Sequence, residues 1–238
     1  LSRALSPGRE QRLSFGNGRA PIRAVLFDLD GTLLDTAPDM VGAMNALRAQ
    51  EALPPLDFAL ARAQVSHGTN GLMRIGFPDA EGEILDRLRE RFLALYRARL
   101  CDETGLFPGG DTLLEHIERA SLPWGVVTNK PGWLAGPLLA GLGLERRMAC
   151  LVSGDTLPVR KPHPQPLLHA AEAIGVAPQS CVYVGDALRD IEAARAAGMR
   201  AVVASFGYIS PADEPHLWPA QAWIDDPRGL IDWLGSPT

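Results

Sequence analysis

The stretch "VLFDLDGTLLDT" at residues 25–36 places two carboxylates, Asp28 and Asp30, directly after an apolar run. The run 22–27 is typical of a buried strand, and side chains two positions apart on a strand point to the same side. Two like charges about 4 Å apart repel by about 4 kcal/mol at an effective dielectric of about 20. A bound cation, a reaction on phosphate, or both would explain why two carboxylates lie so close together.

Other polar side chains recur where further apolar runs end. In chain order they are Thr128, Asn129, Lys161, Asp186 and Asp190. Ligands in open α/β sheets gather beyond the carboxyl ends of the strands. We therefore expect these groups to meet the two aspartates at one site.

This set of groups fits phosphoryl transfer. A carboxylate can attack phosphorus and form an aspartyl-phosphate, and we assign that attack to Asp28. Asp30 would protonate the leaving oxygen and then deprotonate the attacking water, a role typically worth about 10²–10⁴-fold. Lys161 would offset the charges of the phosphate and the nucleophile. The Thr128 hydroxyl and the Asn129 backbone N–H would donate to phosphate oxygens.

The negative charge of such a substrate predicts Mg2+ as the cofactor. This ion prefers hard oxygen ligands from one or two carboxylates plus phosphate and water. Asp28 and Asp186 would supply the carboxylates, and the backbone carbonyl of Asp30 could add another oxygen. Asp190, near a helix start, suits the holding of a metal-bound water, and a plain helix N-terminal charge is its alternative interpretation. Gly31 would relieve the backbone where the chain turns sharply.

Two further cations are candidates for substrate contact. Lys130 follows Asn129 directly, and we expect it to reach the substrate. Arg74, in the small and polar segment "SHGTNGLMR" (66–74), could pair with a substrate carboxylate. An ordinary surface arginine is the alternative interpretation of Arg74, so it stays outside the catalytic set.

Short apolar runs alternate with helical patterns along most of the chain. Strands are expected at 22–27, 124–128, 149–153, 181–185, 200–204 and, more weakly, 222–224. Helices are expected at 111–120, 134–142, 166–174 and 188–197. This alternation predicts an α/β fold whose parallel sheet is covered on both faces.

Residues 37–105 break the alternation, because they contain no convincing strand. A helical stripe is clearest at Ile84, Leu88, Phe92, Leu95 and Tyr96. We interpret this block as an inserted, all-helical subdomain. The predicted division is a leader at 1–20, a core at 21–36 and 106–238, and the helical block at 37–105.

The composition limits the classes of function. A net charge of −5 without a dense Lys/Arg tract gives nucleic-acid binding little support. No apolar stretch is long enough to span a bilayer, and residues 1–20 lack the apolar core of a signal peptide. Three cysteines without metal-like spacing predict reduced thiols, the last two buried, in a cytoplasmic protein. No heptad run points to an assembly, so we expect a monomer or a small homo-oligomer.

Four motifs together resemble the haloacid dehalogenase superfamily. They are "DLDGTLLDT", "VVTNK", "RKPHP" and "GDALRD", and they occur in the order and spacing of that family. The resemblance covers the chain from about residue 23 onward. It implies a Rossmann-like core, Mg2+, and a phosphatase acting on a small phosphorylated metabolite. The helical block resembles the cap that one branch carries between its first and second motifs.

Two substrates remain open within that branch. The segments "FDLDGTLLDTAPD", "VVTNKP" and "KPHPQPLL" look like phosphoglycolate phosphatases. The tail "GYISPADEPHLWPA" at 207–220 looks more like a group that dephosphorylates N-acetylmuramic acid 6-phosphate in peptidoglycan recycling.

Three other functions compete with this hypothesis. A sugar-phosphate mutase would keep the same motifs and return the phosphoryl group to a product. A phospho-receiver signalling module also phosphorylates an Asp, but it usually lacks a capping insertion and an acid at the position of Asp30. A catalytically inactive binding module would not need the intact set of nucleophile, acid, lysine and metal ligands.

Overall fold

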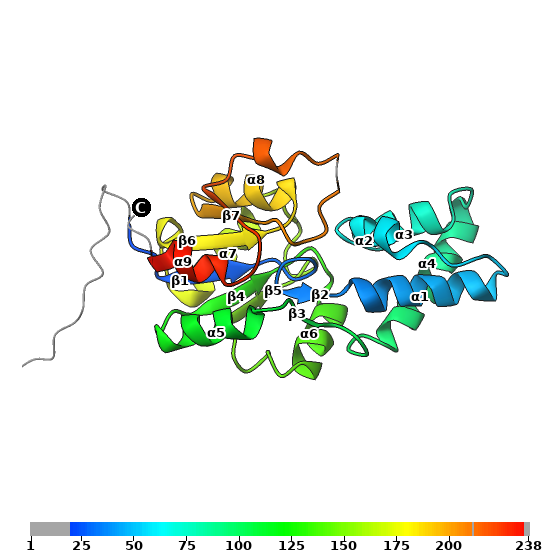
Figure 1. Cartoon of the computed structure of the whole chain (residues 1–238), viewed down its shortest axis with the longest axis horizontal. Helices are drawn as coiled ribbons and strands as arrows, with labels where there is room; N and C mark the ends of the chain where they lie inside the picture. Colours follow the sequence, from blue (N-terminus) through cyan, green and yellow to red (C-terminus); the bar gives the residue numbers. More distant parts are fainter. Residues whose placement is uncertain (1–19, 211, 236–238) are drawn as a thin grey trace, which may run out of the picture.

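The computed structural model describes residues 20–210 and 212–235, and a six-stranded parallel sheet forms its centre (Figure 1). The strand order is β5-β4-β1-β6-β7-β8. The strands span Ala24–Phe27 (β1), Trp124–Val127 (β4), Cys150–Val152 (β5), Cys181–Gly185 (β6), Arg200–Ala204 (β7) and Ala222–Ile224 (β8). Each predicted apolar run forms one of these strands, and the predicted Rossmann-like α/β fold is confirmed.

Helices cover both faces of the sheet, because alternate strand residues point to opposite faces. Val25 and Phe27 of β1 pack in a core with α5, α6 and α9, whereas Ala24 and Leu26 pack in a second core with α7 and α8. These helices span Gly110–Arg119 (α5), Gly132–Gly141 (α6), Gln165–Ile174 (α7), Leu188–Ala196 (α8) and Gly229–Gly235 (α9). The two apolar layers fix the carboxyl ends of the central strands relative to one another.

Four more helices, α1 to α4, lie together at one end of the molecule (Figure 1). They span Ala37–Gln50 (α1), Phe58–Val65 (α2), Gly68–Gly76 (α3) and Gly82–Arg97 (α4). The stripe on α4 packs inward at Leu88, Phe92 and Tyr96, while Ile84 in its first turn is exposed. We keep the predicted division into a core and a helical cap at 37–105 as a proposal.

A small antiparallel pair joins the sheet to the cap helices. β2 (Leu34–Asp35) pairs with β3 (Gly105–Leu106), so the chain enters and leaves the helical block side by side. Strands of two residues are too short to carry an alternating pattern, and this explains why the sequence predicts no strand here.

Asp39, in the first turn of α1, fastens the two crossing segments to each other. Its side chain is fully buried. Oδ2 accepts hydrogen bonds from the backbone N–H groups of Glu103 and Thr104, at 3.0 and 2.9 Å, and from the Thr104 hydroxyl at 2.7 Å. Arg99 Nε lies 3.4 Å from Oδ1. One carboxylate thereby satisfies several polar groups at the junction of residues 34–39 and 103–106, which we call the hinge.

The remaining described segments are short. The sequence does not predict α9 or the 3-10 helices η1 (Pro178–Ser180) and η2 (Pro215–Leu217).

All three cysteines are free. Cys181 is buried as expected, but Cys150 is only half-buried because β5 is an edge strand. Within the described ranges, no helix has both the length and the apolar character that crossing a membrane requires. The predicted leader lies outside the described residues except for Ala20.

Replacing Asp39 with alanine should lower the free energy of unfolding by about 3 kcal/mol, because it leaves buried N–H donors without an acceptor. Urea unfolding followed by circular dichroism would measure the change. Asp102→Ala is the matched control, because Asp102 is an exposed neighbour whose side chain makes no hydrogen bond to a described residue. We expect that control to stay within about 0.5 kcal/mol of the parent protein. Equal effects of the two substitutions would refute the hinge role of Asp39.

Candidate active site

Asp28 and Asp30 lie just beyond β1, where the strand ends at Phe27 and the chain turns. Their carboxylates do not share one partner. Asp28 Oδ1 lies 2.9 Å from Lys161 Nζ, whereas Asp30 Oδ1 lies 2.8 Å from Lys130 Nζ. Each acid has its own cation, and this offsets the repulsion that their spacing in the sequence predicts.

Gly31 allows the turn after Asp30 to approach the end of β6. Its φ of +82° lies in the left-handed region that favours glycine. A Cβ atom at this position would lie 2.2 Å from Asp186 Oδ2, well inside van der Waals contact. The expected sharp turn at Gly31 is therefore also a place of close contact with a candidate metal ligand.

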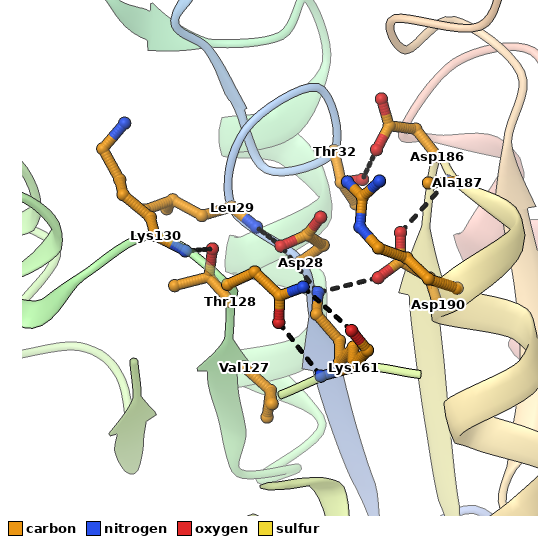
Figure 2. Close-up of polar contacts among 12 residues, drawn as sticks. Asp28, Leu29, Thr32, Val127, Thr128, Lys130, Lys161, Asp186, Ala187 and Asp190 are labelled. Atoms are coloured by element: carbon orange, nitrogen blue, oxygen red, sulfur yellow. Dashed lines mark hydrogen bonds and ion pairs between the residues drawn. The ribbon is translucent and has the colours of Figure 1, made fainter. Parts of the chain in front are cut away.

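The Lys161 ammonium is fully buried and lies among three oxygen acceptors, of which those of Asp28 and Asp190 can be seen in Figure 2. Its Nζ lies 2.9 Å from Asp28 Oδ1, 2.7 Å from Asp190 Oδ1 and 2.7 Å from the Tyr183 hydroxyl. An ammonium has three N–H donors, so each donor has one partner. Tyr183 in turn donates to the carbonyl of Val127 at 2.7 Å. This network connects the ends of β1, β4 and β6 through one cation.

Asn129 fixes the backbone of the loop that carries Lys161. Its Nδ2 donates to the Lys161 carbonyl, and its Oδ1 accepts from the Lys161 N–H, both at 3.0 Å. The sequence predicts a role only for the backbone N–H of Asn129, and the structure adds a positioning role for its side chain. Among the described residues that N–H has no backbone acceptor. The neighbouring Thr128 hydroxyl is buried and accepts from the Lys130 N–H at 3.1 Å.

Asp28, Asp186 and Asp190 form a buried acidic cluster, with one carboxylate oxygen from each within 4.8 Å of the others. Ionised and taken with Lys161, they carry a net charge of −2. Burial, Asp28 and Asp190 together raise the pKa of Asp186 to about 8. The hydrogen-bond donors to Asp186 are neutral: the Tyr208 N–H at 2.8 Å and, more distantly, the Thr32 hydroxyl at 3.5 Å.

These residues fit a divalent metal ion such as Mg2+. A charge of −2 is what one such ion balances, and the available donors are the hard oxygens that it prefers. Asp28 Oδ2 and the Asp30 carbonyl accept no hydrogen bond within the described part of the chain. The residues that would hold the ion are Asp28 and Asp186, with the Asp30 carbonyl, while the Asp30 side chain turns to Lys130.

Asp190 is already bonded through both of its oxygens. Oδ1 accepts from Lys161, and Oδ2 accepts from the Ala187 N–H at 3.0 Å, at the start of α8. The structure therefore joins the two interpretations of this residue, a charge at a helix N-terminus and a neighbour of the metal ligands. Its expected hold on a metal-bound water stays a prediction.

Lys130 extends away from Asp28, on the other side of the turn (Figure 2). Its Nζ lies 2.8 Å from Asp30 Oδ1 and 2.9 Å from the Tyr96 hydroxyl of α4. Burial opposes its charge, but Asp30 and Tyr96 outweigh that effect and raise the pKa of Lys130. Its expected contact with the substrate stays a prediction, since its observed partners are an acid and a cap tyrosine.

A cavity of about 400 Å³ separates this cluster of side chains from the cap helices. Asp30, Thr128, Asn129 and Lys130 line its inner wall, and residues 65–70 line the wall formed by the cap. Two arginines, Arg160 and Arg189, add positive charge. The cavity thus joins most of the predicted substrate-binding residues, but Arg74 is exposed and lies outside its lining.

Tyr208 is a site residue that the sequence analysis missed. Its N–H donates to Asp186, while its buried hydroxyl accepts from the Ala37 N–H at 2.8 Å and donates to Asp35 at 2.7 Å. Arg62 of α2 stacks over its ring at 4.8 Å. Tyr183, Tyr96 and Tyr208 give no local signal in the sequence, because their contacts with Lys161, Lys130 and Asp186 each join residues more than 20 positions apart in the chain.

Comparison with known proteins identifies related sequences across most of the chain. Residues 22–198 match the family model for haloacid dehalogenase-like hydrolases. A phosphoglycolate phosphatase of Xanthomonas campestris pv. campestris is 47% identical over 215 residues, covering 90% of this chain and 97% of the relative. An N-acetylmuramic acid 6-phosphate phosphatase of Pseudomonas putida is 42% identical over 215 residues, covering 89% and 96%.

A solved structure supports the same grouping. The crystal structure of a predicted phosphoglycolate phosphatase from Haemophilus somnus superposes with a TM-score of 0.80 at 25% sequence identity. The alignment covers 89% of this chain and 97% of that structure. Both the fold and the sequence therefore agree with the resemblance carried by the four motifs. The chain belongs to the haloacid dehalogenase-like hydrolase family.

Proposed function

We propose that this protein hydrolyses phosphate monoesters of small metabolites through an aspartyl-phosphate on Asp28, with Mg2+ as its cofactor. The observation that carries the proposal is the environment of Asp28. Its carboxylate is buried beside the Lys161 ammonium, belongs to an acidic cluster with Asp186, and lies at the end of a central strand. A carboxylate in that position is oriented for attack and surrounded by positive charge once a divalent ion is bound.

Each residue around Asp28 would have a separate role in the first step, the attack of Asp28 on phosphorus. Lys161 holds one oxygen of Asp28 and offsets the charge of an incoming phosphate. The Thr128 hydroxyl and the Asn129 N–H would donate to the phosphate oxygens, and Asn129 also fixes the loop of Lys161. The metal ion, held by Asp28 and Asp186, would supply charge neutralisation at the phosphate.

Asp30 would serve as the general acid and base. Its carboxylate faces the cavity and bonds to Lys130 and to the Thr36 hydroxyl at 2.7 Å. In the first half of the reaction it would protonate the leaving oxygen, and in the second half it would remove a proton from the attacking water.

Phosphoglycolate is the first candidate substrate, because relatives with that name reach 47% identity. N-acetylmuramic acid 6-phosphate is the second, supported by a 42% identical relative and by the sequence of the tail at 207–220. The cavity of about 400 Å³ has the volume of roughly 13 water molecules, which is ample for a two-carbon acid and leaves room for a sugar. The cytoplasmic location and the monomeric or small oligomeric state stay predictions.

Release of inorganic phosphate from both candidates, measured side by side with Mg2+ and with EDTA, tests the proposal. We expect release that EDTA abolishes, with a strong preference for one substrate. Weak, EDTA-sensitive release from both would keep the chemistry and exclude these two substrates as preferred ones. If no phosphate ester of a wider panel releases inorganic phosphate in a metal-dependent way, the proposed phosphatase activity is refuted.

Isosteric substitutions should separate the roles of the two aspartates. Asp28→Asn should abolish turnover, because an amide is a poor nucleophile. Asp30→Asn should lower kcat by about 10²–10⁴-fold and accumulate phosphoenzyme, because the acid–base step is lost. Steady-state assays and intact-mass detection of a phosphorylated chain would measure both effects, with melting temperature as the check on folding. Near-parental activity of Asp28→Asn would exclude it as the nucleophile.

Asp186→Asn should remove the response of melting temperature to Mg2+. The parent protein should melt at a higher temperature with Mg2+ than with EDTA, because the ion binds the folded state. In EDTA the variant should be at least as stable as the parent, since it removes repulsion from a buried acidic cluster. Asp225→Asn, at an exposed residue outside the cluster, is the matched control and should respond like the parent. A full Mg2+ response in Asp186→Asn would contradict the ligand assignment.

A further inference from the structure

Arg189 is a partly buried cation on the wall of the cavity that forms no ion pair with a described carboxylate, although the charges of Asp190, Asp28 and Asp186 outweigh burial and raise its pKa. It lies on α8, one residue before Asp190. Its Nη2 donates to the carbonyl of Ser66 at 2.8 Å and to the Ser66 hydroxyl at 3.3 Å. Both acceptors are neutral. No carboxylate of the described residues forms an ion pair with Arg189, and Nε and Nη1 have no hydrogen-bond acceptor among those residues.

The other cations that line the cavity are less suited to receive an anion. Lys130 is paired with Asp30. Arg160 is exposed, and its Nε donates to the carbonyl of Gly154. Burial, Arg189 and Arg74 lower the pKa of His67, which disfavours its charged form. Arg189 alone among them combines partial burial, permanent charge and two guanidinium nitrogens, Nε and Nη1, that have no acceptor among the described residues.

A guanidinium in this state has the chemistry of a carboxylate receptor. Its planar fork can form two parallel N–H···O bonds to one carboxylate, and removal from water strengthens them. Phosphate is expected next to Asp28, Thr128 and Lys161, and of these residues Thr128 lines the same cavity as Arg189. A substrate whose phosphate lies there and whose leaving group contacts Arg189 would suit this cavity best if the leaving group were acidic.

We propose that Arg189 binds a carboxylate on the leaving group of the substrate and so selects phosphorylated acids over neutral phosphate esters. This inference rests on the proposed phosphatase function and deepens it. Both candidate substrates carry a carboxylate in addition to the phosphate. The sequence makes Arg74 of the cap a candidate for such a contact, but Arg74 lies outside the cavity lining, whereas Arg189 of the core is part of it.

Arg189 also joins the core to the cap through Ser66, so a purely structural role needs to be separated from recognition. Loss of a bridge between core and cap would lower kcat/KM for every substrate alike. Loss of a carboxylate receptor would lower it for acids only. The ratio of kcat/KM between matched acidic and neutral substrates therefore distinguishes the two roles.

The test measures kcat/KM for two matched pairs with Mg2+. One pair is N-acetylmuramic acid 6-phosphate and N-acetylglucosamine 6-phosphate, which differ only in the lactyl group. The other is 2-phosphoglycolate and ethyl phosphate, and p-nitrophenyl phosphate reports the chemistry alone. The variants are Arg189→Gln, Arg189→Lys as the one that keeps the charge, and Arg195→Gln as the matched control on an exposed part of α8 outside the cavity.

In the parent protein we expect the acid of at least one pair to be preferred. Arg189→Gln should lower that acid-to-neutral ratio by about 10–100-fold, the loss typical of a charge-assisted hydrogen-bonded pair. Arg189→Lys should lower it less, and Arg195→Gln should leave it unchanged. Melting curves would show that each variant is folded, and the lysine variant alone decides the question if the glutamine variant does not fold.

Three results would overturn the inference. The first is a parent protein that does not prefer the acid in either pair. The second is a ratio that stays within about threefold in both Arg189 variants. The third is an absence of phosphate release from every substrate, p-nitrophenyl phosphate included, which would refute the proposed function itself. Activity on p-nitrophenyl phosphate with an unchanged ratio would refute only the role of Arg189.

Discussion

The buried ammonium of Lys161 is the interaction on which the organisation of the site depends. Its three donors bond to Asp28 after β1, to Asp190 at the start of α8, and to Tyr183 on β6. A fully buried cation is costly unless each donor is satisfied and a counter-charge is close. The ends of the central strands must therefore stay in register for the cation to be tolerated. The stability of the core and the geometry of the site thus both require that the Lys161 ammonium keeps its three partners.

Charge balance explains why the site is built from several elements. The ionised acidic cluster keeps a net charge of −2 after Lys161 is counted, and burial together with Asp28 and Asp190 raises the pKa of Asp186. A bound divalent ion would balance this excess negative charge. The repulsion among the three carboxylates, which destabilises the cluster without the ion, would then be offset. The second carboxylate of the turn, Asp30, stays apart from this cluster because Lys130 holds it. Two neighbouring acids can therefore have separate roles.

The cavity exists only between the core and the cap helices, and a few polar contacts join the two parts across it. Arg62 of α2 donates to the carbonyls of Phe206 and Gly207, both at 3.0 Å, and lies over the ring of Tyr208. Tyr208 also bonds to Asp186 and to the hinge at Ala37. One tyrosine therefore contacts the candidate metal ligand, the hinge and the cap.

The sequence by itself determined the strands, the helical block and the chemistry-bearing residues, because these leave local signals. Apolar runs mark the strands, and Asp28, Thr128, Lys161 and Asp186 each stand next to the end of a strand or in the loop between two. Parallel strands bring such ends to one edge, so their convergence could be predicted without coordinates. Short elements such as β2 and β3 escaped prediction, since two residues carry no periodicity.

Only the tertiary structure decided which partner each group has. Local patterns could not reveal that Asp28 and Asp30 bond to different lysines, or that Asn129 fixes the Lys161 loop through its side chain. They could not reveal that Arg189, rather than Arg74, lines the cavity. These contacts join residues far apart in the chain, and their geometry depends on strand order and on how the cap sits over the sheet. Residue type and spacing specify the chemistry that is available, whereas pairing over long sequence distances is set by the packed fold.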